Sequence, residues 1–131
     1  MRPPIQTAST RPPRGRVLIT GGAGFVGSAL AAHLVRAGRE VVVLDDLSGG
    51  RRSRLPVDAR LEFLLGDAGD PDRLRALLMD GERITRLVHL AAVVGVRRVL
   101  ADPEACRAAH GRLAAALEHA LAAVPVDRRP R

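Results

Sequence analysis

Three glycines and one acidic residue have the types and spacing that bind a dinucleotide. Gly21, Gly24 and Gly27 follow one another at intervals of three, and Asp45 stands about 20 residues further on. The first glycine allows a sharp reversal, the second clears space where a diphosphate approaches the backbone, and the third allows close packing of a helix. Helix N-terminal amides attract the diphosphate, and a carboxylate accepts hydrogen bonds from ribose hydroxyls. The pattern predicts a dinucleotide site; the alternative is a glycine turn with a structural role alone.

The segments that flank these glycines are the ones that must position such a site. Branched apolar residues at 17–20 predict a buried strand, and the apolar spacing that begins at Phe25 predicts a helix. This helix is expected to end at Gly38, where a left-handed cap needs no Cβ. A second apolar run at 41–44 leads directly to Asp45. Strand, glycine turn, helix, strand and acid form a βαβ unit, and this order favours the dinucleotide interpretation.

Strand and helix patterns continue to alternate up to residue 124. Residues 47–60 have turn chemistry and no period, and residues 93–101 are mixed and give no clear assignment. The remaining predicted elements are strands at 61–65 and 86–90, and helices that begin at Asp70-Pro71 and Asp102-Pro103 and end at Gly81 and Pro125. The alternation predicts an α/β fold of the Rossmann type: a doubly wound parallel sheet of about four strands, order 3-2-1-4, with flanking helices.

Four motifs in order resemble the NAD-dependent epimerase/dehydratase family, the extended short-chain dehydrogenases that act on nucleotide sugars. They are TGGAGFVGS at 20–28, DDLS at 45–48, GDAGD at 66–70 and HLAA at 89–92. In the second motif Asp46 replaces the Asn that the family has there. The resemblance extends from about Gly15 to Pro103, and it implies that NAD is the cofactor.

The resemblance also implies which residues contact the cofactor. Asp67 and the backbone at Ala68 are expected to meet the adenine ring, although Asp67 could instead only cap its own turn. The turn at Ala91 is expected near the nicotinamide ribose, whereas His89 precedes that turn and is interpreted as structural. The complete set of predicted cofactor-binding residues is Gly21, Gly24, Phe25, Val26, Gly27, Asp45, Asp46, Leu47, Ser48, Asp67, Ala68, Leu90, Ala91 and Ala92.

Three arginines in the loop after Asp45 raise the question of NADP. Arg51, Arg52 and Arg54 would attract the 2′-phosphate that distinguishes NADP from NAD. Asp45 would face that phosphate with like charge, so NAD is favoured.

The family's catalytic pair has no counterpart among the 131 residues. The resemblance implies a Tyr-x-x-x-Lys pair, in which the tyrosine takes the proton from a sugar hydroxyl and the lysine lowers its pKa. The sequence contains no Tyr and no Lys, so no catalytic residue is assigned. No metal ligand is assigned, because the single Cys106 cannot alone form a zinc site. We therefore expect a half-length member, inactive alone, that meets a nucleotide sugar only if a C-terminal half is supplied. A truncated gene product, a frame disruption and one part of a split protein remain open.

The net charge of +7 comes mainly from the two ends of the chain. Residues 1–16 hold four Arg and no acid, and residues 124–131 hold three Arg and Asp127, so residues 17–123 have 14 Arg against 13 acids. Without Tyr or Trp to stack on bases, a nucleic-acid partner is not predicted. A protein that binds nucleic acid through its basic tails is kept as a further hypothesis. The single Cys106 forms no internal disulfide, and no run approaches the about 18 apolar residues of a membrane span. A cytoplasmic protein is expected.

The composition divides the chain into one domain and two ends. Residues 15–124 are predicted to form the NAD-binding domain, and residues 1–14 and 125–131 are predicted to be disordered basic tails. The fourth strand would then have an unpaired edge, which favours self-association or a partner chain. A non-catalytic NAD-binding module that docks to a partner through this edge is the alternative function.

Overall fold

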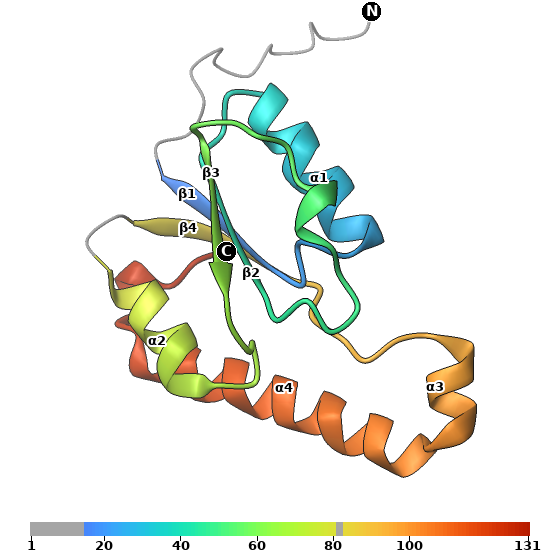
Figure 1. Cartoon of the computed structure of the whole chain (residues 1–131). Coiled ribbons are helices and arrows are strands. Elements are labelled where there is room, and N and C mark those ends of the chain that lie inside the picture. The colour runs from blue at the N-terminus through green and yellow to red at the C-terminus, as the bar shows by residue number, and fades with distance from the viewer. Residues whose placement is uncertain (1–14, 81–82) are drawn as a thin grey trace, which may run out of the picture.

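The computed structural model of the chain describes residues 15–80 and 83–131 (Figure 1). The predicted disordered tail at 1–14 and the predicted helix end at Gly81 lie outside the described residues. The described residues form a twisted sheet with helices on both sides.

Four parallel strands form the sheet, in the order β3-β2-β1-β4. They are β1 (Arg16–Thr20), β2 (Val41–Asp45), β3 (Leu61–Leu65) and β4 (Ile84–His89). The two central strands, β1 and β2, are buried on both faces, and branched apolar residues suit such strands. The predicted α/β fold and the strand order 3-2-1-4 are confirmed.

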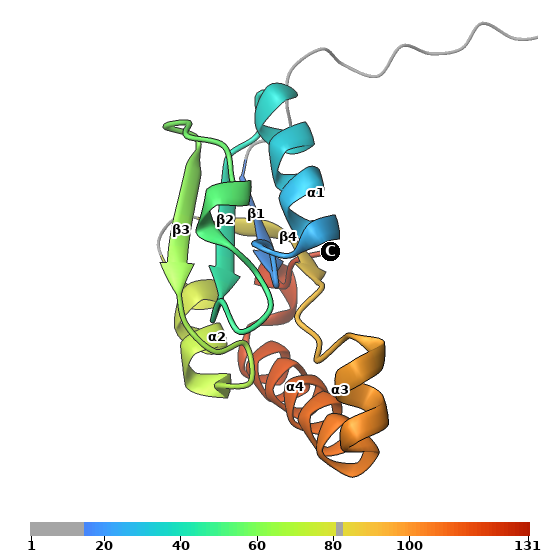
Figure 2. The same ribbon diagram turned by 45° about the vertical axis from the view of Figure 1, so that its right-hand side comes forward.

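Helices cover the two faces of the sheet unequally. They are α1 (Phe25–Arg36), α2 (Pro71–Met79), α3 (Val96–Ala101) and α4 (Pro103–Ala123), with short 3-10 helices η1 (Arg52–Arg54) and η2 (Val126–Arg128). Figure 2 shows α1 on one side of the sheet and α2 with α4 on the other. Alternate strand residues serve the two cores: Ile19 and Val43 pack on the α1 side, whereas Leu18 and Leu44 pack with α2 and α4.

Side-chain caps start the two helices that cover the second face. Asp70 accepts hydrogen bonds from the amides of Asp72 and Arg73, and Asp102 accepts one from the Ala105 amide. A proline follows each cap and occupies the first helical turn. The helix starts predicted from the two Asp-Pro pairs are therefore confirmed.

The C-terminal segment differs from the prediction of a disordered tail at 125–131. Residues 126–128 form η2, and the Arg131 amide donates to the Thr85 carbonyl at 3.0 Å. The Leu87 amide donates in turn to the Arg131 carbonyl at 3.0 Å, so Arg131 pairs with β4 as a parallel strand would. The prediction of disorder was based on the Pro and Arg content of the segment. It did not consider that the edge of β4 offers unpaired backbone N–H and C=O groups, with which a nearby backbone segment can form hydrogen bonds. At this position the edge of β4 is therefore covered.

Candidate functional site

The turn between β1 and α1 is built so tightly that it requires glycine at two of the predicted positions. Gly21 has a φ of +69°, and a Cβ there would lie 2.6 Å from the Ala91 amide nitrogen. A Cβ at Gly27 would lie 2.5 Å from the Gly21 carbonyl oxygen. The first glycine thus brings the turn against the end of β4, and the last brings α1 against the turn.

The first turn of α1 presents backbone donors. Its N-cap is Gly24, which offers no side-chain cap, and the first amide that bonds back to the cap region is that of Ser28. Among the described residues, the amides of Phe25, Val26 and Gly27 have no hydrogen-bond acceptor. Three unpaired N–H groups at the positive end of a helix dipole form a site for an anion such as a diphosphate.

Asp45 ends β2 beside this turn, and the residue is only 7% exposed. One carboxylate oxygen accepts the Ala23 amide at 2.9 Å, and the other accepts the Leu47 amide at 2.8 Å. Each oxygen of a carboxylate has two lone pairs, so each retains one for a ligand hydroxyl. Asp45 therefore fixes the glycine turn and still has acceptor capacity on the side of the pocket.

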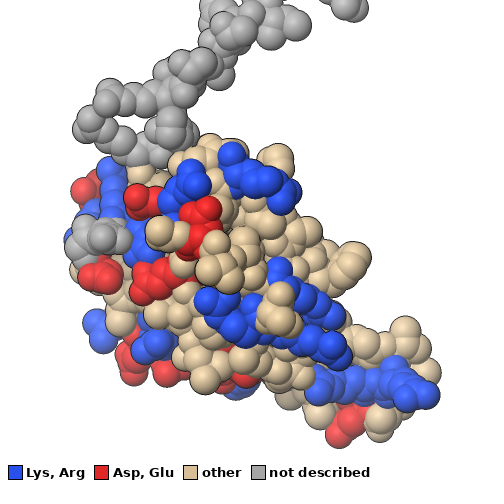
Figure 3. Space-filling model, turned by 45° about the horizontal axis from the view of Figure 1, so that its top comes forward, with Lys and Arg blue, Asp and Glu red and all other residues tan. Residues whose placement is uncertain are grey.

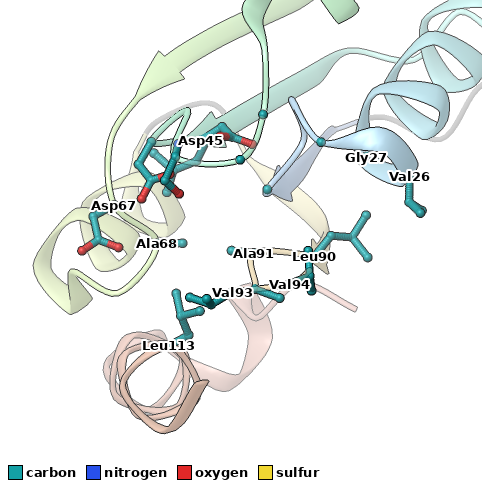
Figure 4. Close-up of a pocket in the computed structure, with 18 of the residues that line it drawn as sticks. Val26, Gly27, Asp45, Asp67, Ala68, Leu90, Ala91, Val93, Val94 and Leu113 are labelled. Carbon is teal, nitrogen blue, oxygen red and sulfur yellow. The ribbon is translucent and has the colours of Figure 1, made fainter. Parts of the chain in front are cut away.

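A pocket of about 410 Å³ joins these groups at the carboxyl ends of the strands (Figure 4). Every predicted cofactor-binding residue except Leu47 lines it. Leu47 has a φ of +62°, and its side chain packs with the apolar cluster under α1, so only its amide serves the site, through Asp45. Figure 4 shows Val26, Asp67 and Leu113 around one opening, although they come from α1, the β3–α2 turn and α4.

Sequence reasoning missed part of the pocket wall. Gly50 could have been found by its glycine chemistry: a Cβ there would lie 2.8 Å from the Ala23 carbonyl carbon, where the loop after β2 packs on the glycine turn. Arg112 carries no local signal, because only the packing of α4 brings it to the pocket. Arg54 also lines the pocket, and the sequence had suggested it only for the 2′-phosphate of NADP. The missed lining residues are Leu44, Gly49, Gly50, Gly66, Val93, Val94, Arg112 and Leu113.

Asp67 is held by two bonds at the β3 end of the pocket. One carboxylate oxygen accepts the Gly69 amide at 2.7 Å, and the other accepts Nη1 of Arg112 at 2.7 Å. Burial acts to raise the pKa of Asp67, but the Gly69 amide and the Arg112 guanidinium outweigh it, so the pKa is lowered. Asp67 is therefore ionised and acts as a hydrogen-bond acceptor at neutral pH.

His89 ends β4 just before the lining residue Leu90, does not itself line the pocket, and has a structural arrangement. Its Nδ1 is 2.7 Å from Oγ1 of Thr20, and the Ala91 amide donates to the same oxygen at 3.4 Å. Burial lowers the pKa of His89, which favours the neutral ring. In the neutral tautomer that carries its hydrogen on Nε2, the Thr20 hydroxyl donates to Nδ1; in the other tautomer, Nδ1–H donates to the hydroxyl oxygen. In both, that oxygen also accepts from the Ala91 amide, so the pair fixes the turn after β4.

The charge on the surface is mixed. Figure 3 shows basic side chains beside acidic ones on one part of the face in view, and a mainly basic band across its centre. No group of three or more potential metal ligands occurs within residues 15–80 and 83–131. No helix in the described part of the chain has the length and apolar character needed to cross a membrane.

A parallel sheet of order 3-2-1-4, with a glycine turn after the first strand and an acid after the second, defines a Rossmann-type domain. Residues 17–129 match the model of the NAD dependent epimerase/dehydratase family. The chain belongs to this family.

Individual relatives and solved structures agree with this family assignment. A UDP-glucose 4-epimerase of Streptomyces lividans is 43% identical over 90 residues, which are 69% of this chain and 27% of that protein. Epimerase Mth375 of Methanothermobacter thermautotrophicus has a TM-score of 0.73 at 33% identity, over 83% of this chain and 32% of that one. A Thermus thermophilus UDP-glucose 4-epimerase, solved as a complex with NAD, has a TM-score of 0.65 at 32% identity. The match covers 80% of this chain and 34% of that one.

The match covers only the N-terminal part of longer proteins. The chain spans 27% of the Streptomyces relative and 66% of a UDP-glucose 4-epimerase from Klebsiella pneumoniae, with which it is 37% identical. The resemblance and the cofactor that it implied agree with the family's NAD dependence and with neighbours solved with NAD.

Proposed function

We propose that this chain binds NAD(H) as the N-terminal domain of a nucleotide-sugar epimerase or dehydratase. One observation carries the proposal: the unpaired amides of α1 and the carboxylate of Asp45 face a single pocket at the carboxyl ends of the strands. The diphosphate would lie on the amides of Phe25, Val26 and Gly27, and the adenosine ribose on Asp45.

The strand order then sets the direction of the ligand. The adenine would lie beyond β2, toward Asp67 and Ala68 at the end of β3, and the nicotinamide half would lie toward Leu90 and Ala91 after β4. The residues present fit the cofactor, because the glycine turn leaves its donors uncovered and Asp45 keeps free lone pairs.

We further propose that the 131 residues bind the cofactor without turning over a sugar. Bound NAD would supply a hydride acceptor, but a base is needed to take the proton from the sugar hydroxyl. No residue in the sequence is Tyr or Lys. The chain's own groups orient the cofactor, and a nucleotide sugar would be met only together with a C-terminal half.

NAD is favoured over NADP because of the charges at the ribose end. Of the three loop arginines only Arg54 lines the pocket, while the Arg52 guanidinium lies 4.9 Å from the ring centroid of Phe63. Asp45 would oppose a 2′-phosphate at close range. We therefore expect clearly weaker binding of NADP than of NAD.

Isothermal titration calorimetry with NAD tests the proposed function. Asp45→Ala removes the ribose acceptor, and we expect a loss of about 1.5–3 kcal/mol of binding free energy. Because Asp45 also holds the glycine turn, Asp45→Asn, which keeps one acceptor oxygen, is measured beside it, and circular dichroism checks the fold. Asp58→Asn, which makes the same charge change before β3 and outside the pocket, is the control. Equal affinity of the wild type and Asp45→Ala would contradict the proposal.

A second candidate function is a non-catalytic NAD-binding module that docks to a partner chain or to a second copy. Apolar side chains rim the pocket mouth: Phe25 is 85% exposed and Val94 73%. On the outer edge of β4, the backbone bonds made by the described residues are those of Arg131 with Thr85 and Leu87. Co-purification followed by size exclusion with light scattering tests this function: a stable, stoichiometric complex supports it, and recovery of only a lone monomer or aggregate contradicts it.

A further inference from the structure

We propose that Arg112 of α4 is a positioning residue for adenine recognition, because it locks the Asp67 carboxylate in the orientation that accepts the adenine amino group. This inference rests on the proposed NAD function, and the experiment below separates the two. Arg112 lies outside the four sequence motifs that carry the family resemblance. It reaches the pocket because α4 passes beneath the turn after β3 (Figures 1 and 4).

Two elements hold the Asp67 carboxylate from opposite sides. The Gly69 amide, in Asp67's own turn, binds Oδ1 at 2.7 Å, and Nη1 of Arg112 binds Oδ2 at 2.7 Å. A carboxylate with one donor on each oxygen cannot rotate freely, and it retains one lone pair on each oxygen for a ligand. The pair sets a direction for the next hydrogen bond.

The turn around Asp67 leaves room for the guanidinium. A Cβ at Gly69 would lie 1.8 Å from Nη1 of Arg112, so the guanidinium occupies the space that a side chain at 69 would take. Both partners are about half exposed, at 54% and 45%, and such an ion pair contributes little to folding stability. The contact is therefore better explained by the pocket that both residues line.

The groups at this end complement adenine specifically. Asp67 is an acceptor, and the adjacent Ala68 amide has no acceptor among the residues that the structure describes. Adenine offers the opposite pattern, an amino donor beside a ring-nitrogen acceptor. Hypoxanthine has a carbonyl oxygen and a protonated ring nitrogen at the same places, so it would present an acceptor to Asp67 and a donor to an N–H.

Calorimetry with two ligands, NAD and nicotinamide hypoxanthine dinucleotide, tests the assignment. The wild type should prefer NAD. Arg112→Gln should weaken NAD binding about tenfold while changing the affinity for the hypoxanthine analogue much less, so that the preference collapses. Arg112→Lys should restore part of the preference, because a lysine keeps the charge but not the planar geometry.

Gly69→Ala provides a second variant that leaves Arg112 in the sequence. Its new Cβ displaces the guanidinium while the amide at 69 still binds Asp67, so the same loss of preference is expected. Added to Arg112→Gln, it should have no further effect, because both changes break one contact. Arg107→Gln is the matched control: Arg107 is on the same helix, pairs with Glu104 at 2.9 Å and does not line the pocket.

The outcomes separate the two proposals. If the wild type binds neither ligand, the proposed NAD function fails. If the wild type prefers NAD and Arg112→Gln keeps the same ratio of affinities, or weakens both ligands equally, the role of Arg112 is overturned while the NAD function stands. Thermal unfolding of each variant identifies any loss that comes from the fold.

Discussion

Buried polar side chains fix the two turns that border the pocket. Asp45 binds the amide of Ala23 in the glycine turn, and the Thr20 hydroxyl links the Ala91 amide to His89 in the turn after β4. Asp45 satisfies a buried backbone donor, and the Thr20 hydroxyl satisfies a partly buried one. The shape of the pocket therefore depends on them even before a ligand contacts them.

The lowered pKa of His89 makes the stability of the protein depend on pH. Burial holds the pKa of His89 below its usual value of 6.5, so the unfolded chain takes up the proton at a higher pH than the folded chain. The contribution of neutral His89 to the free energy of unfolding should therefore be fully present above about pH 6.5. It should be lost as the pH falls through the lower pKa of the folded state. Urea unfolding midpoints between pH 8 and pH 5 measure this. The urea midpoint of the His89→Asn variant, which keeps an acceptor near the position of Nδ1, should decline less steeply over that range than that of the wild type. Parallel plots of midpoint against pH for the wild type and the variant would contradict the prediction.

The sequence predicted the site residues whose type the local motif requires. It did not predict the residues that reach the site only through the packing of distant elements. Gly21 and Asp45 were found because a positive φ and a ribose acceptor are demands of the motif itself. Gly22 falls outside the three-residue spacing of the motif, yet a Cβ there would lie 2.7 Å from Cγ1 of Val43 in the neighbouring strand. Arg112 is about 45 residues from its partner Asp67, and no local pattern predicts a contact at that separation.

Among the elements, α2 depends on one capping side chain. Asp70 accepts from two amides of the first turn, so Asp70→Ala should lower the free energy of unfolding by about 0.5–2 kcal/mol. Asp72→Ala is the control, because this acid lies in the same turn, is exposed and makes only a 3.5 Å pair with Arg75. Chemical denaturation of the two variants should separate them clearly; equal losses would show that the charge of the first turn, and not the cap, stabilises α2.

The elements that sequence reasoning predicted well are those with a strong local signal. The strands and the capped helices have apolar periods and Asp-Pro starts, and each was predicted at its place in the chain order. The bounds of β4 differ, because it runs over Ile84–His89 and the prediction was 86–90. Residues 93–101 gave no clear assignment, and the structure forms α3 from Val96–Ala101. Val96 and Leu100 on this helix are both 75% exposed, so no buried apolar face produced a helical pattern. Its contacts with other elements are chiefly with α4, which no periodicity would indicate.

At the scale of the whole molecule, β4 is an edge strand of the sheet. The central strands are buried on both faces, whereas β4 pairs on one side with β1 and on the other side only with Arg131 among the residues described. The same two backbone bonds that order the C-terminal segment occupy the place of a fifth parallel strand. Proposals about partners therefore depend on how firmly this segment is held.

Hydrogen exchange measures how firmly the C-terminal segment is held. The Leu87 amide donates to Arg131 at 3.0 Å, so it should be protected in the full chain, although less than the Val42 amide in the centre of the sheet. Deletion of residues 129–131 removes that acceptor, and Leu87 should then exchange at least about tenfold faster while Val42 is unchanged. Arg131→Ala keeps the backbone acceptor and should leave the protection of Leu87 intact, which separates backbone pairing from the arginine charge. Rapid exchange of Leu87 in the full chain would show that the edge of β4 is open, and it would strengthen the docking function over a closed domain.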